Sequence, residues 1–246
     1  MSFMRIVLLS DIHANVSALR AVLDDLQNLG DFEAFAILGD LVNYGPRPNE
    51  IIEMVQHLSS EIIVNLWGNH EYSIFGGNLE RFATDRGRAV LKYTHSILTD
   101  ASKSYLENQM NHRGFMECRI EQKLFLFMHG NLDDPYWGKF GIDKINDERF
   151  AKYDYVISGH SHVPHYVEYF FPSGNIEYRN KKRTIFINPG SVGQPRNQNP
   201  LAQYGILDTD TGDYVHRCVW YDVKNEQRQF SDSVDKFYKE RLTLGI

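Results

Sequence analysis

The first seventy residues alternate between short apolar runs and amphipathic segments, and this alternation restricts the possible folds strongly. Apolar runs typical of buried strands lie at residues 4–9, 35–38 and 61–66. The segment after the first run has a capping residue at Asn15 and apolar side chains at helical spacing: Val16, Leu19, Val22, Leu23 and Leu26. A second helix is expected at residues 49–58. The resulting β-α-β-α-β order predicts parallel strands with right-handed crossovers.

Each of these apolar runs is followed at once by side chains that can bind a metal. Asp11 and His13 follow the first run, Asp40 follows the second, and Asn69 and His70 follow the third. Ligands of parallel α/β sheets bind beyond the carboxyl ends of the strands. We therefore expect these scattered polar residues to form one site.

The second half continues the pattern with histidines. His129 follows an apolar run at 123–128, and His160 and His162 follow another at 153–157. Two residues that are two positions apart point to the same face of an extended chain, so His160 and His162 can hold one metal.

Further strands are expected in the second half, and turn residues join neighbouring runs as hairpins. The turns lie at 173–175 and 211–213, and the strands at 165–170, 184–187, 202–208 and 214–221. This part is predicted to be a mostly antiparallel sheet, followed by a short helix at 234–242. Residues 76–112 are more polar and predict a helical insertion. Because there is no internal repeat, we expect a single domain over residues 1–246.

Composition excludes several classes of protein. A net charge of −6 argues against binding to long nucleic acids. The two cysteines are too few for a disulfide framework and fit a reducing compartment. No apolar stretch approaches the roughly 20 residues of a membrane span. Asp11 and His13 interrupt the first apolar run, so no secretory signal is visible. We expect a cytoplasmic protein without a membrane partner.

Seven metal-ligand candidates lie at strand ends, and none of them is a cysteine: Asp11, His13, Asp40, Asn69, His129, His160 and His162. Mixed oxygen and nitrogen ligands suit Mn first, with Fe, Co, Zn or Ni as alternatives. Seven ligands exceed what one ion needs, so two divalent ions with a bridging aspartate are the economical interpretation. Two-metal sites catalyse in-line displacement at phosphorus, and phosphate ester hydrolysis fits.

The ordered motifs resemble the calcineurin-like metallophosphoesterase superfamily, and more closely its compact prokaryotic branch of YfcE-like phosphodiesterases. The motifs are D-x-H at Asp11–His13, G-D at Gly39–Asp40, G-N-H-E at Gly68–Glu71, His129, and G-H-x-H at Gly159–His162. Asn188–Gly193 and the helical insertion extend the similarity over nearly the whole chain. The resemblance implies a four-layer α/β/β/α sandwich.

The resemblance also implies a role for each motif residue. Asp11, His13 and His162 would hold one metal, and Asn69, His129 and His160 the other, with Asp40 as the bridge. A hydroxide held by both metals would attack phosphorus. His70 would contact the phosphate, and could stabilise the transition state or protonate the leaving oxygen.

One position departs from the protein-phosphatase branch of the superfamily. That branch has an aspartate three residues after the bridging one, whereas this chain has Asn43. An amide stabilises an imidazolium less well than a carboxylate, which favours substrates with good leaving groups. Tyr44 and Arg47 follow in a Gly-Pro loop and are predicted substrate-binding residues, together with Asn69 and His70.

The expected function is hydrolysis of phosphodiesters or nucleotide-type substrates, with diadenosine polyphosphates as the sharpest hypothesis. A phosphomonoesterase, including a protein phosphatase, is the first alternative. A binding scaffold with an inactive site and a nuclease are the others. The expected partner is thus a small phosphate ester, and the sequence leaves the native metal and the oligomeric state open.

Overall fold

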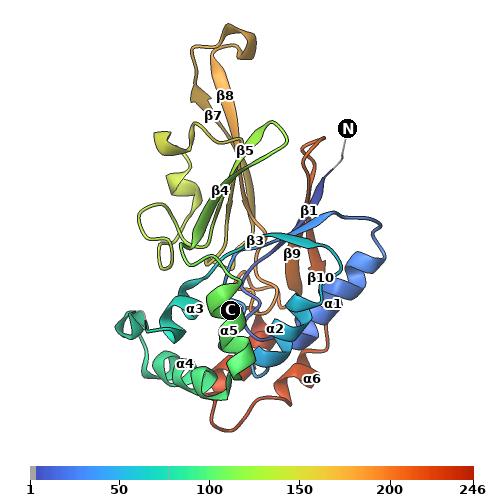
Figure 1. The fold of residues 1–246 in the computed structure, drawn as a ribbon, viewed down its shortest axis with the longest axis vertical. Helices are drawn as coiled ribbons and strands as arrows, with labels where there is room; N and C mark the ends of the chain where they lie inside the picture. Colours follow the sequence, from blue (N-terminus) through green and yellow to red (C-terminus); the bar gives the residue numbers. More distant parts are fainter. Residues whose placement is uncertain (1–3, 77) are drawn as a thin grey trace.

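The computed structural model describes residues 4–76 and 78–246, in which ten strands form two five-stranded sheets. Strand order in the first sheet is β10-β9-β1-β2-β3, and in the second β4-β5-β6-β8-β7. Figure 1 shows most helices gathered around the first sheet, and the β7–β8 hairpin projecting at the opposite end. The predicted single domain and helical insertion both include residues outside the described ones (1–3 and 77).

The first sheet contains the predicted parallel strands: β1 (Arg5–Leu9), β2 (Ala34–Ile37) and β3 (Glu61–Asn65). β2 pairs with both neighbours in parallel. On the other side β1 pairs antiparallel with β9 (Ala202–Asp208), which forms the predicted hairpin with β10 (Tyr214–Val219). The carboxyl ends of β1, β2 and β3 therefore meet at one edge of the sheet.

The second half of the chain does not form the one mostly antiparallel sheet that was predicted, because β9 and β10 join the first sheet and the second sheet is mixed. Its strands are β4 (Phe115–Ile120), β5 (Lys123–Met128), β6 (Tyr155–Ser158), β7 (His165–Pro172) and β8 (Lys181–Asn188). β6 pairs in parallel with β5 and β8, whereas β4 and β7 pair antiparallel at the edges. The long segment between β5 and β6 returns the chain to the starting end of the sheet, so the carboxyl ends of these two strands also coincide.

Helices around the first sheet begin where the sequence places caps. Asn15 accepts a hydrogen bond from Ala18 N (3.0 Å) at the start of α1 (Val16–Gln27), and Pro48 opens α2 (Pro48–Gln56). The insertion contains α4 (Asp85–Ile97) and α5 (Asp100–Asn108), as expected. α6 (Val223–Gln227) and α7 (Lys236–Leu244) follow the last strand. A short helix α3 (Asn69–Ile74) and strand β4 were not anticipated.

Three apolar clusters separate four layers. One lies between the first sheet and its helices, and includes Val7 and Phe35 with Leu19. The second lies between the sheets, where Leu8 of β1 and Phe127 of β5 belong to the same buried cluster. The third covers the outer face of the second sheet, where the loop between β5 and β6 supplies short 3-10 turns. These layers confirm the α/β/β/α sandwich. Among the described residues, no helix has the length and apolar character needed to cross a membrane.

Candidate dinuclear metal centre

The predicted ligands gather where the strands of both sheets end, and several of them have unusual backbone conformations. Asp11, His13, Asp40, His160 and His162 have φ between 47° and 61°, the left-handed region that non-glycine residues rarely adopt. Each such residue costs on the order of 1 kcal/mol, and such conformations concentrate at functional sites. The sharp turns allow each strand to be followed by a side chain directed toward one cluster.

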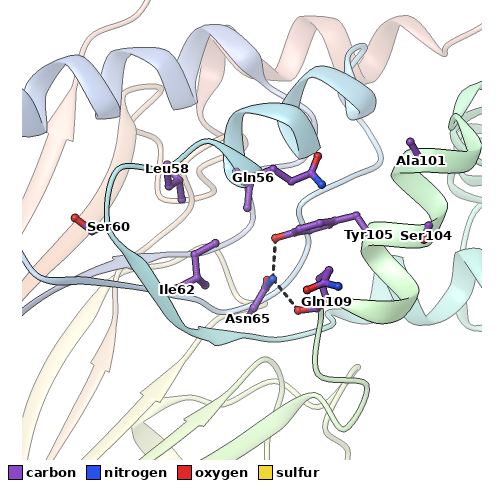
Figure 2. A pocket seen from close by; sticks show the side chains of 10 residues that line it. Gln56, Leu58, Ser60, Ile62, Asn65, Ala101, Ser104, Tyr105 and Gln109 are labelled. Atoms are coloured by element: carbon purple, nitrogen blue, oxygen red, sulfur yellow. Dashed lines mark hydrogen bonds between the residues drawn. The ribbon is translucent and has the colours of Figure 1, made fainter.

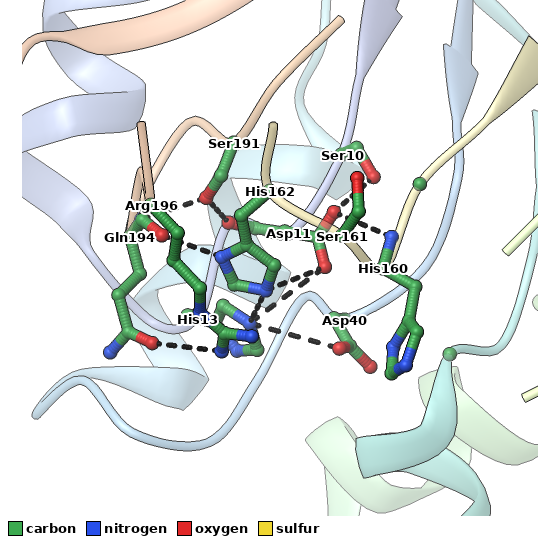
Figure 3. Close-up of polar contacts among 12 residues, drawn as sticks. Ser10, Asp11, His13, Asp40, His160, Ser161, His162, Ser191, Gln194 and Arg196 are labelled. Atoms are coloured by element: carbon green, nitrogen blue, oxygen red, sulfur yellow. Dashed lines mark hydrogen bonds and ion pairs between the residues drawn. The ribbon is translucent and has the colours of Figure 1, made fainter. Parts of the chain in front are cut away.

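One group of side chains could hold a metal ion: Asp11, His13, Asp40 and His162. His162 Nε2 lies 3.1 Å from Asp11 Oδ1 and 3.2 Å from His13 Nε2. His13 Nε2 lies 3.7 Å from Asp40 Oδ2. All four side chains are buried. Figure 3 shows them converging, with His160 on the other side of Asp40.

A second group shares Asp40 with the first and adds His129 and His160. Asp40 Oδ2 lies 3.4 Å from His129 Nε2. Asn69 completes this group, because its Oδ1 lies 3.2 Å from His129 Nε2 and 3.0 Å from His160 Nδ1. Asn69 is the first residue of α3, so the helix start places its amide against the two histidines. The structure thus brings together all seven predicted ligands.

Backbone carbonyls fix which ring nitrogen of three histidines is free. His13 Nδ1 faces Val42 O (3.3 Å), His129 Nδ1 faces Leu38 O (2.7 Å) and His162 Nδ1 faces Gln194 O (2.5 Å). A carbonyl accepts only, so each Nδ1 carries the proton and each Nε2 presents a lone pair to the site. This is the arrangement typical of metal-binding histidines.

The electrostatics of the cluster favour a cation. Burial first, and the neighbouring basic groups second, lower the pKa of His160 to about 3 and that of His162 to about 4. Both are therefore neutral at pH 7. Burial, with the Glu71 and Asp11 carboxylates, raises the pKa of Asp40 well above its usual range. Neutral imidazoles and crowded carboxylates are the groups that a divalent cation would stabilise.

Unsatisfied atoms support the same conclusion. Asp11 Oδ2 accepts hydrogen bonds from Ser10 Oγ (2.5 Å) and His160 N (3.1 Å), but the buried Asp11 Oδ1 has no donor. Its near neighbour His162 Nε2 carries a lone pair, as does His13 Nε2, which lies 3.2 Å from His162 Nε2. Facing lone pairs repel each other unless a cation lies between them. The residues present therefore fit a divalent metal centre.

Glu71 holds two of the strand-end loops in place. Its fully buried carboxylate accepts hydrogen bonds from Asp40 N (2.9 Å), Val42 N (3.2 Å) and Gly68 N (2.9 Å). The loops after β2 and β3 are thus joined at one carboxylate. Gly68 is required at this crossing, because a Cβ there would lie 2.1 Å from Asp40 Oδ1.

His70 lies beside the metal ligands and is oriented by a chain of hydrogen bonds. Its Nε2 lies 3.8 Å from Asp40 Oδ2. Thr94 Oγ1 in α4 donates to Asn43 Oδ1 (2.9 Å), and this leaves Asn43 Nδ2 to donate to His70 Nδ1 (2.5 Å). His70 Nδ1 is then an acceptor, so the ring proton is on Nε2 and faces the site.

The structure separates the two predicted substrate-binding residues of the Gly-Pro loop. The Tyr44 ring lies 4.4 Å from that of His70 and 4.7 Å from that of His13, so Tyr44 forms a wall of the site. Arg47 instead forms an ion pair with the buried Glu226 and donates to Ser17 Oγ (3.2 Å). The charge of Arg47 is satisfied there, and the structure does not bring this side chain to the cluster.

Several residues that shape the site had no predicted role. Thr94 and Tyr238 lie on helices whose packing could not be read from the motifs, and Arg196 follows the Asn188–Gly193 turn. That turn supports the first loop, since Ser191 Oγ donates to Asp11 O (2.7 Å) and Val192 N to Ser10 O (3.0 Å). The G-N-H-E motif includes Glu71. The spacing of the motif does not show that the Glu71 carboxylate accepts hydrogen bonds from three backbone N–H groups.

A large pocket elsewhere has a different character. It has a volume of about 670 Å³ and lies between α2, β3 and α5, where Asn65 Nδ2 donates to Tyr105 OH (2.9 Å) (Figure 2). None of its lining side chains is charged or belongs to the Asp/His cluster. This pocket therefore lacks the carboxylates and imidazoles that the Asp/His cluster brings together.

A two-sheet sandwich with a buried Asp/His/Asn cluster across its strand ends defines a metallohydrolase. The family model described as the calcineurin-like phosphoesterase superfamily domain matches residues 4–212. The chain therefore belongs to the calcineurin-like phosphoesterase superfamily, and it is a metal-dependent phosphoester hydrolase.

Relatives with similar sequences support this membership. Uncharacterized protein MJ0912 from Methanocaldococcus jannaschii is 31% identical over 245 residues, which is 98% of each chain. Phosphodiesterase YfcE from Escherichia coli (strain K12) is 27% identical over 216 residues, covering 84% of this chain and 89% of that protein. The resemblance to the YfcE-like branch is thereby confirmed.

Solved structures share the fold over the whole chain. A metallophosphoesterase from Sphaerobacter thermophilus has a TM-score of 0.76 and 28% identity, with 100% of both chains covered. The hypothetical protein PH1004 from Pyrococcus horikoshii OT3 has a TM-score of 0.82 and 20% identity, with 99% of both chains covered. The second similarity concerns the fold alone.

Proposed function

We propose that the chain is a dinuclear phosphodiesterase in which Asp40 would be the ligand shared by two divalent metal ions. Asp11, His13 and His162 would hold one ion, and Asn69, His129 and His160 the other. The observation that carries this proposal is the position of Asp40 Oδ2, 3.7 Å from His13 Nε2 and 3.4 Å from His129 Nε2. It is the carboxylate common to both ligand groups.

Mn is the first candidate metal, because the set combines carboxylate, amide and imidazole ligands and no thiolate. Two divalent ions held there would polarise phosphoryl oxygens and acidify water, which is the chemistry that phosphate ester hydrolysis needs. The chain itself supplies the side chains that pack around the cluster and a donor that would face the reacting phosphate.

His70 is the proposed catalytic donor. Its Nε2–H, fixed by the contact between Asn43 Nδ2 and His70 Nδ1, faces the same space as Asp40 Oδ2. A hydrogen bond from Nε2 to a phosphoryl oxygen would strengthen as negative charge develops in the transition state. Tyr44 packs against the His70 ring and would limit its rotation.

The proposed substrates are phosphodiesters or nucleotide-type esters with good leaving groups. The name of the relative YfcE and the buried Asp/His cluster support a phosphodiesterase. Asn43 favours good leaving groups, because a neutral His70 facing an amide is a weaker acid catalyst than an imidazolium facing a carboxylate. Diadenosine polyphosphates belong to this class and are our most specific substrate hypothesis. We also propose that the chain acts as a single domain.

The test compares bis(p-nitrophenyl) phosphate with p-nitrophenyl phosphate as substrates of the Mn-loaded protein, with a chelated sample in parallel. We expect metal-dependent turnover that is faster on the diester. Faster turnover of the monoester would replace the proposal with a phosphomonoesterase. No turnover by a protein without bound metal would instead favour a binding scaffold.

A further inference from the structure

The side chain of Arg196 lies beside the Asp/His cluster, and the reaction proposed above does not use it. Arg196 follows the loop that positions His162: its N donates to His162 O (3.2 Å), and Gln194 O accepts from His162 Nδ1. In Figure 3 the Arg196 side chain runs back along Gln194 toward His13. The positive charge of Arg196 is among the causes that lower the pKa of His13, His70 and His162.

The C-terminal helix α7 brings a second arginine to the same place. Tyr238 in α7 is buried and stacks on Tyr44 with a ring separation of 4.7 Å, and Tyr44 in turn contacts His13 and His70. Arg241 lies three residues after Tyr238, so both side chains are on the same face of the helix. The face of α7 that covers Tyr44 therefore also carries Arg241.

The two guanidinium groups lie close enough to affect each other. Burial first, and the charge of Arg196 second, lower the pKa of Arg241 to about 10. Arg241 is half-buried and packs over the Phe237 ring at 4.9 Å. A third arginine, Arg86 in α4, covers the same ring at 3.7 Å. Like charges repel, and an anion bound between these side chains would relieve the repulsion.

Neither arginine is neutralised by an acidic side chain in the described part of the chain. Arg196 donates through one terminal nitrogen to Gln194 Oε1 (3.3 Å), while its buried Nε has no acceptor. Arg241 Nε donates to a main-chain oxygen of Ile246, the last residue of the sequence. Arg47 and Arg217, in contrast, form ion pairs with Glu226 and Asp25. The chain has a net charge of −6, so two arginines without an acidic side-chain partner near the Asp/His cluster are not a consequence of its composition.

We propose that Arg196 and Arg241 bind a second phosphate group of the substrate, adjacent to the phosphate that reacts at the Asp/His cluster. The substrate class is then a phosphoanhydride or another ester with neighbouring phosphates. Arginine binds phosphate oxygens in a planar, two-pronged geometry, and partial burial strengthens such contacts. This inference rests on the proposed function, because it places the reacting phosphate at the metal centre.

The test measures how inorganic pyrophosphate and inorganic phosphate inhibit hydrolysis of bis(p-nitrophenyl) phosphate, with the free Mn²⁺ concentration held constant. In the parental protein we expect the inhibition constant of pyrophosphate to be about tenfold or more below that of phosphate, as one charge-assisted contact would give. Arg241→Gln and Arg196→Gln should each reduce this ratio severalfold. Arg241→Lys, which keeps the charge, should restore most of it.

Arg20→Gln is the matched control, because Arg20 is an exposed arginine on α1. Equal inhibition constants in the parental protein, or an unchanged ratio in both Gln variants, would overturn the proposal. An equal loss in Arg20→Gln would do the same, since the effect would then be one of net charge.

Failure of the proposed function is recognised separately, by the absence of diester hydrolysis. Calorimetry then reports the subsite directly. Pyrophosphate binding to the Mn-loaded protein that weakens severalfold in Arg241→Gln supports the subsite, and binding that does not change removes it.

Discussion

Asp40 and Asn43 lie three residues apart in one loop, and they set different properties of the site. Asp40 Oδ2 is within 3.4–3.8 Å of His129, His13 and His70, so its charge is shared by the whole cluster. Asn43 faces His70 alone and decides which of its nitrogens carries the proton. Metal binding and proton donation are therefore controlled by separate residues of this loop.

Substitution of Asn43 by Asp tests the role of His70. A carboxylate would accept from His70 Nδ1–H and favour the imidazolium, which is the stronger acid. We expect Asn43→Asp to raise kcat about tenfold on diesters with poor leaving groups, and much less on bis(p-nitrophenyl) phosphate. The measurement is the dependence of kcat on leaving-group pKa.

The control for this experiment is Thr94→Val, which removes the donor to Asn43 Oδ1 and leaves the amide free to rotate. Thr94→Val should lower kcat. The dependence of its kcat on leaving-group pKa should stay like that of the parental protein and should not become like that of Asn43→Asp. A leaving-group dependence that is identical in Asn43→Asp and the parental protein would remove His70 from the proton transfer.

Among the elements, the loops that follow the strands carry the metal-ligand candidates, and the contacts that hold these loops determine the geometry of the site. Glu71, in the first turn of α3, accepts three backbone N–H groups from the loops after β2 and β3. The left-handed turns at Asp11, Asp40 and His162 are costly conformations that such contacts must hold.

Replacement of Glu71 by Gln should therefore destabilise the protein strongly. The amide keeps one acceptor oxygen but turns an N–H donor toward a backbone N–H, which leaves two buried donors unsatisfied. We expect a loss of about 2–4 kcal/mol in the free energy of unfolding, measured by urea denaturation. Glu61→Gln, at an exposed position of β3, should change stability by less than about 0.5 kcal/mol.

The elements that carry the ligands could be predicted, because their signals are local. Short apolar runs ending in polar residues identified β1, β2, β3, β5 and β6, and the topology of parallel strands then placed their ends together. α3 was missed because it has only six residues and begins soon after β3 ends at Asn65. β4 was missed because its burial alternates only partly, and the mixed order of the second sheet depends on tertiary pairing.

The walls of the site could not be predicted, since they depend on packing between distant segments. Tyr238 meets Tyr44 from the opposite end of the chain, and nothing in the local sequence of α7 indicates this contact. The position of the Arg47 side chain also depends on packing between distant segments. Its loop position suggested a phosphate ligand, but the buried Glu226 of α6 binds its guanidinium.

For the whole molecule, the number of buried histidines determines the response to acid. Burial lowers the pKa of His162 and of His165 to about 4, and lowers those of five other buried or partly buried residues: His13, His70, His129, His160 and His216. As pH falls below about 6.5, the unfolded chain takes up protons that the folded chain does not. Stability is then lost progressively from about pH 6.5 toward about pH 4.

Two carboxyl groups act in the opposite direction. The pKa values of Asp40 and Glu71 are raised, chiefly by burial, so protonation of these groups favours the folded state. Because seven histidines outnumber them, we expect chelated protein to lose several kcal/mol of unfolding free energy between about pH 7 and pH 5. Urea denaturation at these two pH values is the measurement, and equal stability at both would contradict the assignment of neutral histidines.

The metal content of the protein and of an Asp40→Asn variant tests the central claim most directly. The amide introduced by this substitution would keep an oxygen to accept from His70 N but would lack the charge shared by both ligand groups. After equilibration with Mn²⁺ and removal of free metal, elemental analysis should find two ions per parental chain and fewer than one per Asp40→Asn chain. A His162→Ala variant should retain about one ion, since only one ligand group is damaged. Two ions in a folded Asp40→Asn protein, or a single ion in the parental protein, would contradict the bridged dinuclear centre.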